Sequence, residues 1–107
     1  IHPFDAGARG IEAGDVVRIF NDRGACLAGA VVSDGVMPGV IALATGAWYA
    51  AAGAGQLERH GNPNVLTRDV GTSRLAQGCT AHTALVDVAR YDGPVPPLSA
   101  HEPPAIE

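Results

Sequence analysis

The chain has 107 residues, of which 47% are hydrophobic and 17% charged, and its formal net charge is -4. This length suits one domain with a real core and leaves no room for two. Glycine and proline together occupy 22 positions (14 plus 8), which favours a turn-rich β protein over a helix bundle. All seven basic residues are arginines, without a cluster, and no apolar run reaches the roughly 18 residues of a membrane helix. We therefore expect neither a nucleic-acid partner nor a membrane span.

The first part of the chain, residues 1–43, alternates short apolar runs with turn residues. A helix is predicted at Pro3–Arg9, because proline suits the first helical turn and a glycine follows the segment. β-Branched and aromatic residues predict strands, the first two paired as a hairpin, at Val16–Phe20, Ala25–Ser33 and Val40–Leu43. The core candidates are Val17, Ile19, Leu27, Val31, Val32 and Ile41.

The second part, from about Ala44 to Leu57, combines two large aromatic residues with an alanine and glycine tract. Trp48 and Tyr49 either cap the core at the end of a strand or form a wall for a planar ligand. The small residues of Ala50–Gly55 are typical of a mobile loop.

The third part begins with the polar stretch His60–Gly78, which places amides, hydroxyls and glycines where core residues would otherwise stand. Asn62 and Asn64 flank a proline and could present both amides to one ligand, although an asparagine-rich turn has the same composition. Farther along, the hydroxyls before Arg74–Gln77 resemble an N-cap and predict a short helix whose free amides could hold a phosphate. The stretch therefore indicates ligand binding by hydrogen bonds and close backbone approach.

The remainder is predicted to be a final core strand within Cys79–Tyr91, followed by an extended, proline-rich tail at residues 92–107. The tail contains a PxxP pattern, but its composition fits a plain linker better. Cys26 and Cys79 lack metal-ligand or redox spacing and are expected to be free, buried thiols. A disulfide between them would need Cα atoms within about 7 Å.

Enzymatic chemistry within this chain is poorly supported. Ser73 with Asp69 and either His60 or His82 offers the residue types of a hydrolase triad, but no Gly-x-Ser-x-Gly motif surrounds the serine. The four histidines also lack the spacing of a metal site. We expect no catalytic residue and no metal ligand here.

Four segments together resemble the C-terminal cofactor-binding domain of the dimethyl sulfoxide reductase family. They are Gly14–Gly24, Pro38–Val40, Gly46–Tyr49 and, above all, His60–Gly78 with its sequences HGNPNVLT and GTSRLAQG. The resemblance extends over residues 1–91 in unbroken order. Within the family, the chain is most similar to the biotin sulfoxide and trimethylamine N-oxide reductases.

The resemblance implies a mainly β fold, a double-psi β-barrel with one or two short helices, that closes over bis(molybdopterin guanine dinucleotide). The remaining domains of the parent enzyme hold most of this cofactor and supply the molybdenum ligand, so the chain alone is expected to lack the cofactor and turnover. The parent would reduce S-oxides or N-oxides by oxygen-atom transfer. The cofactor-binding residues implied are Gly46, Trp48, Tyr49, His60, Gly61, Asn62, Asn64, Thr72, Ser73 and Gln77.

Two departures from the family pattern carry further expectations. The chain starts at Ile1, after a strand and a histidine-serine segment that help complete the barrel in the family, so it reads as a piece of a longer protein whose barrel could lack its first strand. The resulting open edge favours self-association. The Ala50–Gly55 tract is also less acidic than in the family. A cytoplasmic location is expected, with a periplasmic one as the alternative, and a stand-alone barrel for another nucleotide-like ligand is the alternative function.

Overall fold

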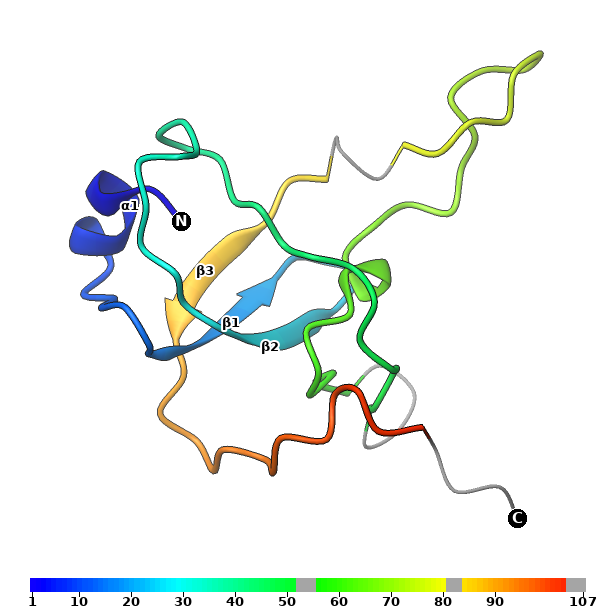
Figure 1. The fold of residues 1–107 in the computed structure, drawn as a ribbon. Coiled ribbons are helices and arrows are strands. Elements are labelled where there is room, and N and C mark those ends of the chain that lie inside the picture. Colours follow the sequence, from blue (N-terminus) through cyan, green and yellow to red (C-terminus); the bar gives the residue numbers. More distant parts are fainter. Residues whose placement is uncertain (52–55, 81–83, 104–107) are drawn as a thin grey trace.

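The computed structural model describes residues 1–51, 56–80 and 84–103. The fold is mainly β, with a small antiparallel sheet and two short helical turns (Figure 1). The elements, in chain order, are α1 (Pro3–Ala8), β1 (Val16–Phe20), β2 (Ala25–Gly29), the 3-10 helix η1 (Pro63–Val65) and β3 (Asp87–Arg90). The first helix and the first strand confirm the predictions from sequence, and so does the fold class. Most of the predicted loop Ala50–Gly55 lies outside the described residues.

The three strands pair in the order β2-β1-β3, with β1 antiparallel to both neighbours. Ile19 in the central strand lies opposite Cys26 on one side and Val88 on the other. All three side chains are buried and belong to one hydrophobic cluster, because residues opposite each other in a ladder point to the same face. A described sheet of three strands accords with a partial barrel.

The core forms mainly on the face of the sheet that carries Val17 and Ile19, which are both buried as predicted. Leu27 is also buried, but it lies outside that cluster and faces the proline-rich segment that includes Val95. Val32 and Ile41 are only partly buried against the core. The prediction for Val31 was wrong, since its side chain is 73% exposed.

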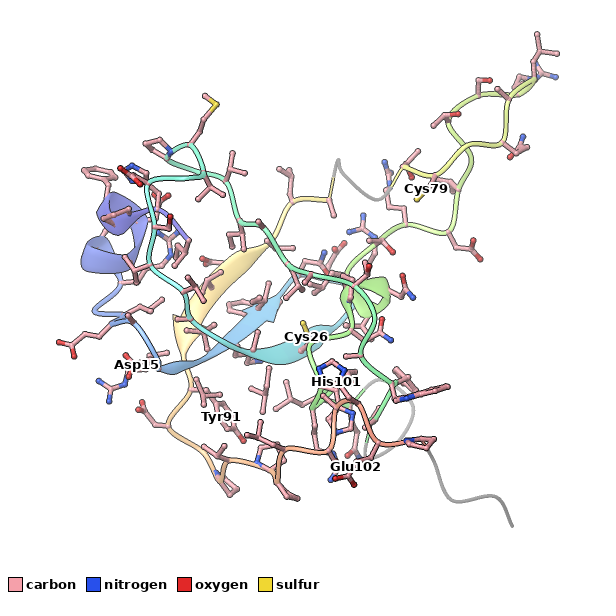
Figure 2. The ribbon with its side chains drawn as sticks, in the orientation of Figure 1. Asp15, Cys26, Cys79, Tyr91, His101 and Glu102 are labelled. Atoms are coloured by element: carbon pink, nitrogen blue, oxygen red, sulfur yellow. The ribbon has the colours of Figure 1, made fainter. Side chains whose placement is uncertain are left out.

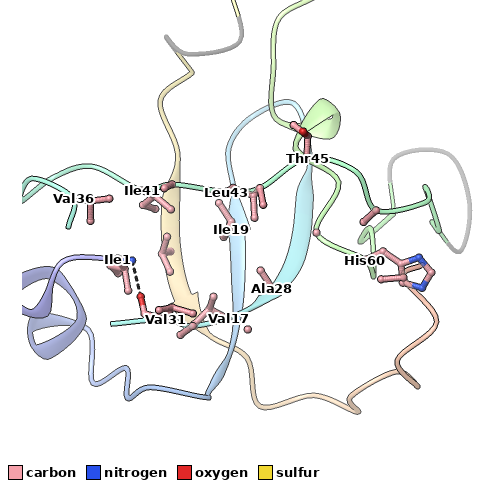
Figure 3. A pocket seen from close by; sticks show the side chains of 18 of the residues that line it. Ile1, Val17, Ile19, Ala28, Val31, Val36, Ile41, Leu43, Thr45 and His60 are labelled. Carbon is pink, nitrogen blue, oxygen red and sulfur yellow. Dashed lines mark hydrogen bonds between the residues drawn. The ribbon is translucent and has the colours of Figure 1, made fainter. Parts of the chain in front are cut away.

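Two strand predictions were also wrong in extent. β2 ends at Gly29 rather than Ser33, because its partner β1 begins only after a turn in which Gly14 has a φ of 90°. The segment Val40–Leu43 is not a strand. It crosses the face of the sheet above an apolar cavity of about 480 Å³ (Figure 3) instead of lying along an edge, where backbone pairing would be possible.

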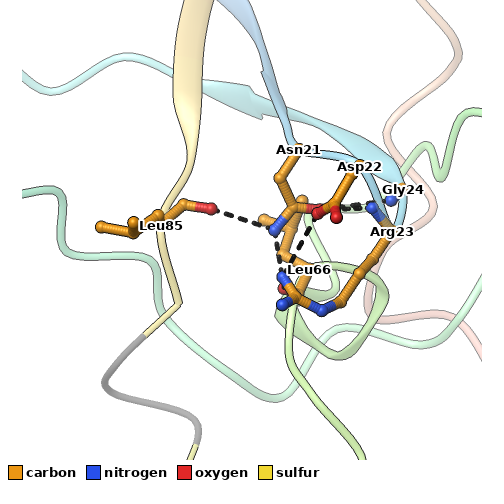
Figure 4. A network of polar contacts seen from close by, with 6 residues as sticks. All are labelled: Asn21, Asp22, Arg23, Gly24, Leu66 and Leu85. Atoms are coloured by element: carbon orange, nitrogen blue, oxygen red, sulfur yellow. Dashed lines mark hydrogen bonds and ion pairs between the residues drawn. The ribbon is translucent and has the colours of Figure 1, made fainter.

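Asn21 joins the turn between β1 and β2 to two distant segments (Figure 4). Its Nδ2 donates to the carbonyl oxygens of Leu66 at 2.8 Å and Leu85 at 3.1 Å. Its Oδ1 accepts from the backbone N–H groups of Arg23 at 2.9 Å and Gly24 at 3.3 Å. One amide therefore satisfies the turn and connects it to one residue within the polar stretch and to one after it.

The predicted helix at Arg74–Gln77 does not form. The segment Gly71–Cys79 is instead a narrow hairpin, closed by a bond from Thr72 N to Gly78 O at 3.1 Å, that projects from the body of the protein (Figure 1). The final strand is also shorter than expected, since β3 begins at Asp87. Because of such extensions, the radius of gyration is 14.7 Å, against about 13 Å for a compact chain of this length.

The proline-rich segment after Tyr91 returns to the body of the protein rather than pointing away from it. The carbonyl oxygen of Ala100 accepts from Trp48 N at 2.9 Å, and the Ser99 hydroxyl lies 3.0 Å from His60 Nε2. The division of the chain at residue 91 stays a prediction. Among the described residues, no helix has the length and apolar character to cross a membrane.

Cys26 and Cys79 form no disulfide, as expected. Cys26 is buried in β2, whereas Cys79 is exposed on the projecting hairpin (Figure 2), so the prediction of burial was wrong for Cys79. Burial raises the pKa of the Cys26 thiol to about 11, and the negative charge of Glu58 adds to this effect. The backbone of Glu58 also occupies part of the outer edge of β2, donating to Ala25 O and accepting from Leu27 N, both at 2.9 Å. Self-association through a sheet edge stays a prediction.

Candidate functional site

Two loops that sequence reasoning had singled out lie side by side. One contains Trp48 and Tyr49, whose side chains are 50% and 61% exposed, and the other begins at His60. Nδ1 of His60 lies 2.8 Å from the carbonyl oxygen of Trp48. Because a carbonyl oxygen only accepts, Nδ1 carries the proton in this contact. The rings of Trp48 and Tyr49 therefore lie at the surface, and the imidazole of His60 holds the backbone that carries them in place.

Asn62 and Asn64 flank the same proline, but they have different roles in the structure. Asn62 caps η1: its Oδ1 accepts from Asn64 N at 3.0 Å, and its Nδ2 donates to Ala47 O at 3.5 Å. The side chain of Asn64 is exposed and has no hydrogen bond within the part of the chain that the structure describes. Asn64 can therefore offer a donor and an acceptor to a ligand, whereas Asn62 is largely used within the fold.

Glu58, which sequence reasoning missed, lies beneath both loops and is fully buried at 0% exposure. Its Oε1 accepts from Ala50 N and His60 N, both at 3.0 Å, and its Oε2 accepts from Asn62 N at 2.7 Å. The only signal in the sequence is a lone acidic residue between a small-residue tract and the polar stretch, and its burial is not visible there. The carboxylate joins the two loops through three backbone amides.

Two of the predicted glycines occupy backbone conformations that disfavour other residues. Gly46 has a φ of 111° and Gly61 a φ of 74°, both in the left-handed region that glycine adopts without strain. A Cβ at Gly61 would also come within 3.2 Å of the Leu27 carbonyl oxygen. The loop can therefore pass close to β2 only with glycine at this position.

The structure does not bring Thr72, Ser73 and Gln77 to these loops. They lie on the projecting hairpin, and their side chains hydrogen-bond within it: Thr72 Oγ1 donates to Ala76 O at 2.8 Å, and Gln77 Nε2 donates to Ser73 O at 2.9 Å. Ser73 Oγ accepts from Ala76 N at 2.8 Å. The phosphate site that a helix would have formed here is absent, because the hydroxyl stabilises a turn instead. Their role as cofactor-binding residues stays a prediction.

The apolar cavity adjoins the loops at His60 and Gly61, but its other walls come from the sheet and from the segment above it (Figure 3). Val17, Ile19 and Val88 line its floor. Such walls offer few partners for a phosphate or a base edge. The exposed surface of the two loops is therefore the better candidate for a polar, planar ligand.

Nothing in this arrangement resembles a hydrolase triad or a metal centre. Ser73 lies on the hairpin, while His60 bonds to Trp48 O and Ser99; His82 lies outside the described residues. Across residues 1–51, 56–80 and 84–103, no group of three or more His, Cys, Asp or Glu side chains is placed to hold a metal ion. What the two loops can do chemically is stack against and hydrogen-bond a ligand.

Comparison with known proteins assigns the chain to a family. The family described as Molydopterin dinucleotide binding domain matches residues 1–85. The chain is 54% identical over 108 residues to a trimethylamine-N-oxide reductase of Salmonella typhi, an alignment that covers 98% of the chain and 13% of that protein. It is 57% identical over 98 residues to trimethylamine-N-oxide reductase 1 of Escherichia coli strain K12, covering 89% of the chain and 12% of that protein.

A third relative, the trimethylamine-N-oxide reductase of Vibrio cholerae, is 50% identical over 102 residues, covering 94% of the chain and 12% of that protein. The chain thus spans 12–13% of the length of these curated relatives. The matched region includes both loops, the buried glutamate and the hairpin. The family match and these identities, over nearly the whole chain, show that it belongs to the molybdopterin dinucleotide-binding domain family.

Proposed function

We propose that this chain is the cofactor-binding domain of a molybdenum oxidoreductase that reduces N-oxides, and that its two loops hold part of bis(molybdopterin guanine dinucleotide). The single observation that carries the proposal is the 54% identity to a trimethylamine-N-oxide reductase over 98% of the chain. The exposed groups of the two loops support it, because their chemistry suits a dinucleotide that contains flat rings.

The described residues fit this cofactor in kind. Trp48 and Tyr49 present exposed rings, against which a pterin or guanine can stack. The side-chain amide of Asn64 is exposed beside η1 and can pair with the polar edge of a ring. At Gly46, none of the described residues other than its chain neighbours has an atom within 4 Å of the position of a Cβ, so a ligand can approach the backbone there. These residues would bind the cofactor on the outer side of the loops.

The chain's own contribution is to orient the cofactor and to exclude water from one side of it. When bound in the parent enzyme, the cofactor supplies the molybdenum redox couple on which oxygen-atom transfer depends. His60 keeps the Trp48 backbone in place through the 2.8 Å contact from Nδ1, and Asn62 holds the start of η1. A surface that is fixed before binding loses less conformational entropy when the ligand arrives.

The substrate class proposed is N-oxides rather than S-oxides. This choice follows the names of the relatives, since the proteins from Salmonella typhi, Escherichia coli and Vibrio cholerae are all trimethylamine-N-oxide reductases. S-oxides are the competing substrates that the experiment below compares directly.

The proposed partners of this domain are the remaining domains of the parent enzyme. Leu75 on the hairpin is 99% exposed, and Leu98 in the proline-rich segment is 97% exposed. Each of these leucines could bury its apolar side chain against a neighbouring domain, which would stabilise the contact. The hairpin and the proline-rich segment are therefore proposed to pack against other parts of the same polypeptide.

The test uses the full-length protein that contains this chain. Its bound molybdenum and guanine nucleotide are measured per polypeptide, and its rate with trimethylamine N-oxide is compared with its rate with dimethyl sulfoxide, with a reduced dye as electron donor. Asn64→Ala is expected to lower cofactor occupancy, whereas Glu12→Ala, at an exposed position in the turn before β1, is the matched control. A full-length protein that holds neither molybdenum nor guanine nucleotide would refute the proposed function, and faster reduction of the sulfoxide would refute the substrate class.

A further inference from the structure

We propose that Glu58 is a positioning residue for the cofactor: its buried carboxylate sets the relative placement of the two loops that carry Trp48 and Asn64. The inference deepens the proposed function and rests on it. It is carried by the three amide hydrogen bonds at the centre of the site and by the burial of the group that accepts them.

The three donors come from both loops. Ala50 N is two residues after Trp48, while His60 N and Asn62 N flank the glycine that passes close to β2. Ala50 is held on its other side as well, because its carbonyl oxygen accepts from Arg59 N at 3.0 Å. A shift of the carboxylate would therefore move both loops at once.

The side chain is anchored by its own backbone to the sheet. Glu58 N donates to Ala25 O and Glu58 O accepts from Leu27 N, both at 2.9 Å, in a parallel bridge to β2. The sheet therefore fixes the backbone from which the carboxylate reaches the loops. A supporting group anchored to a rigid element in this way holds the ligand-contacting residues more precisely than loop contacts alone would.

A carboxylate suits this role better than a neutral side chain of the same shape. It presents two oxygens that only accept, which matches a set of three N–H donors. In glutamine, one oxygen becomes an NH₂ group, which can only donate and would face a backbone N–H. Among the described residues, no arginine or histidine forms an ion pair with Glu58. The amides are therefore the groups that compensate the buried charge.

Two of the three residues that donate to Glu58 are themselves hydrogen-bonded to the backbone around predicted cofactor contacts. His60 holds the carbonyl oxygen of Trp48, and Asn62 holds both Ala47 O and the N–H of Asn64. Glu58 does not touch the exposed surface, being fully buried, so it acts through these residues. Loss of its charge should leave the ligand-contacting side chains present but misplaced.

The experiment compares Glu58→Gln, Glu58→Asp and the control Val88→Ala in the full-length holoenzyme. Val88 is buried in β3, and its replacement by alanine removes core packing without breaking a hydrogen bond to either loop. Molybdenum and guanine nucleotide per polypeptide, the melting temperature and the Mo(V) EPR spectrum are measured. Glu58→Gln is expected to lower occupancy roughly tenfold, the usual order for removing a group that orients ligand-contacting residues. Glu58→Asp, which keeps the charge with a shorter reach, should fall between Glu58→Gln and wild type.

The control separates positioning from general stability. Val88→Ala is expected to lower the melting temperature while keeping occupancy and the EPR spectrum, and the molecules of Glu58→Gln that retain cofactor should show an altered spectrum. Occupancy of Glu58→Gln within twofold of wild type, or an equal loss in Val88→Ala, would overturn the inference and leave the proposed function intact. A wild-type holoenzyme preparation without molybdenum or guanine nucleotide would instead overturn the proposed function itself.

Discussion

Asn62 and Asn64 form a matched pair in which the same substitution should have different consequences. Asn62→Ala removes the cap of η1, in which Oδ1 accepts from Asn64 N at 3.0 Å. Loss of such a cap costs about 1 kcal/mol, and the 3.5 Å contact to Ala47 O adds little at that length. Asn64→Ala removes no side-chain hydrogen bond within the described residues, so its stability should change by less than about 0.5 kcal/mol.

Thermal unfolding of the chain, followed by circular dichroism, checks this difference. A loss of 1 kcal/mol corresponds to a fall in melting temperature of about 4 °C for a domain of this size. Asn62→Ala should show that fall, while Asn64→Ala should melt with the wild type but hold less cofactor in the full-length enzyme. Equal melting temperatures for the two variants would refute the structural role of Asn62, and full occupancy in Asn64→Ala would refute the binding role of Asn64.

Four further predictions concern the core, the glycine and the two thiols. Ile19→Ala should lower the free energy of unfolding by about 3 kcal/mol in urea denaturation, since the side chain is buried; a loss below about 1 kcal/mol would mean that the core is looser than described. Gly61→Ala should cost about 1–2 kcal/mol, because φ is 74° and Leu27 O is close, whereas an unchanged melting temperature would contradict that strain. Iodoacetamide at pH 8 should label exposed Cys79 and spare buried Cys26, with equal labelling as the contrary result. Burial raises the pKa of the Cys26 thiol from 9.0 to about 11, so the folded state keeps this proton to a higher pH than the unfolded state does. The free energy of unfolding should therefore fall as the pH rises between these two values. In Cys26→Ala this part of the fall should be missing, and a pH profile identical to that of the wild type would contradict the assignment.

The prediction for the hairpin failed for a physical reason that is visible in its bonds. Thr72 and Ser73 before Arg74–Gln77 have the composition of a helix start, and the same hydroxyls can cap a turn. Both hydroxyls bond Ala76 O in the structure, which closes the hairpin and leaves Leu75 at the tip. Local sequence could not decide between the two, because a segment of this length has too few helical bonds to offset nucleation.

Strand ends were missed because they depend on the partner rather than on the strand. The apolar run after Gly29 has the composition of β2, yet the strand stops where the turn before β1 ends the ladder. Val40–Leu43 has good strand residues, but it crosses the face of the sheet instead of lying along an edge (Figure 3), so it pairs with none of the described strands. Pairing is a property of two segments, and the periodicity of one segment does not contain it.

What the sequence by itself determined is the set of local features: α1, β1, the buried alternation of Val17 and Ile19, and the motifs that identify the family. These follow from short-range rules of capping, period and composition. Only the tertiary structure decided that Asn62 is bound within the fold while Asn64 is exposed, and that Glu58 lies beneath both loops. The reason is that burial of a charge depends on the packing around it, and part of the packing around Glu58 comes from β2, which is distant in the sequence.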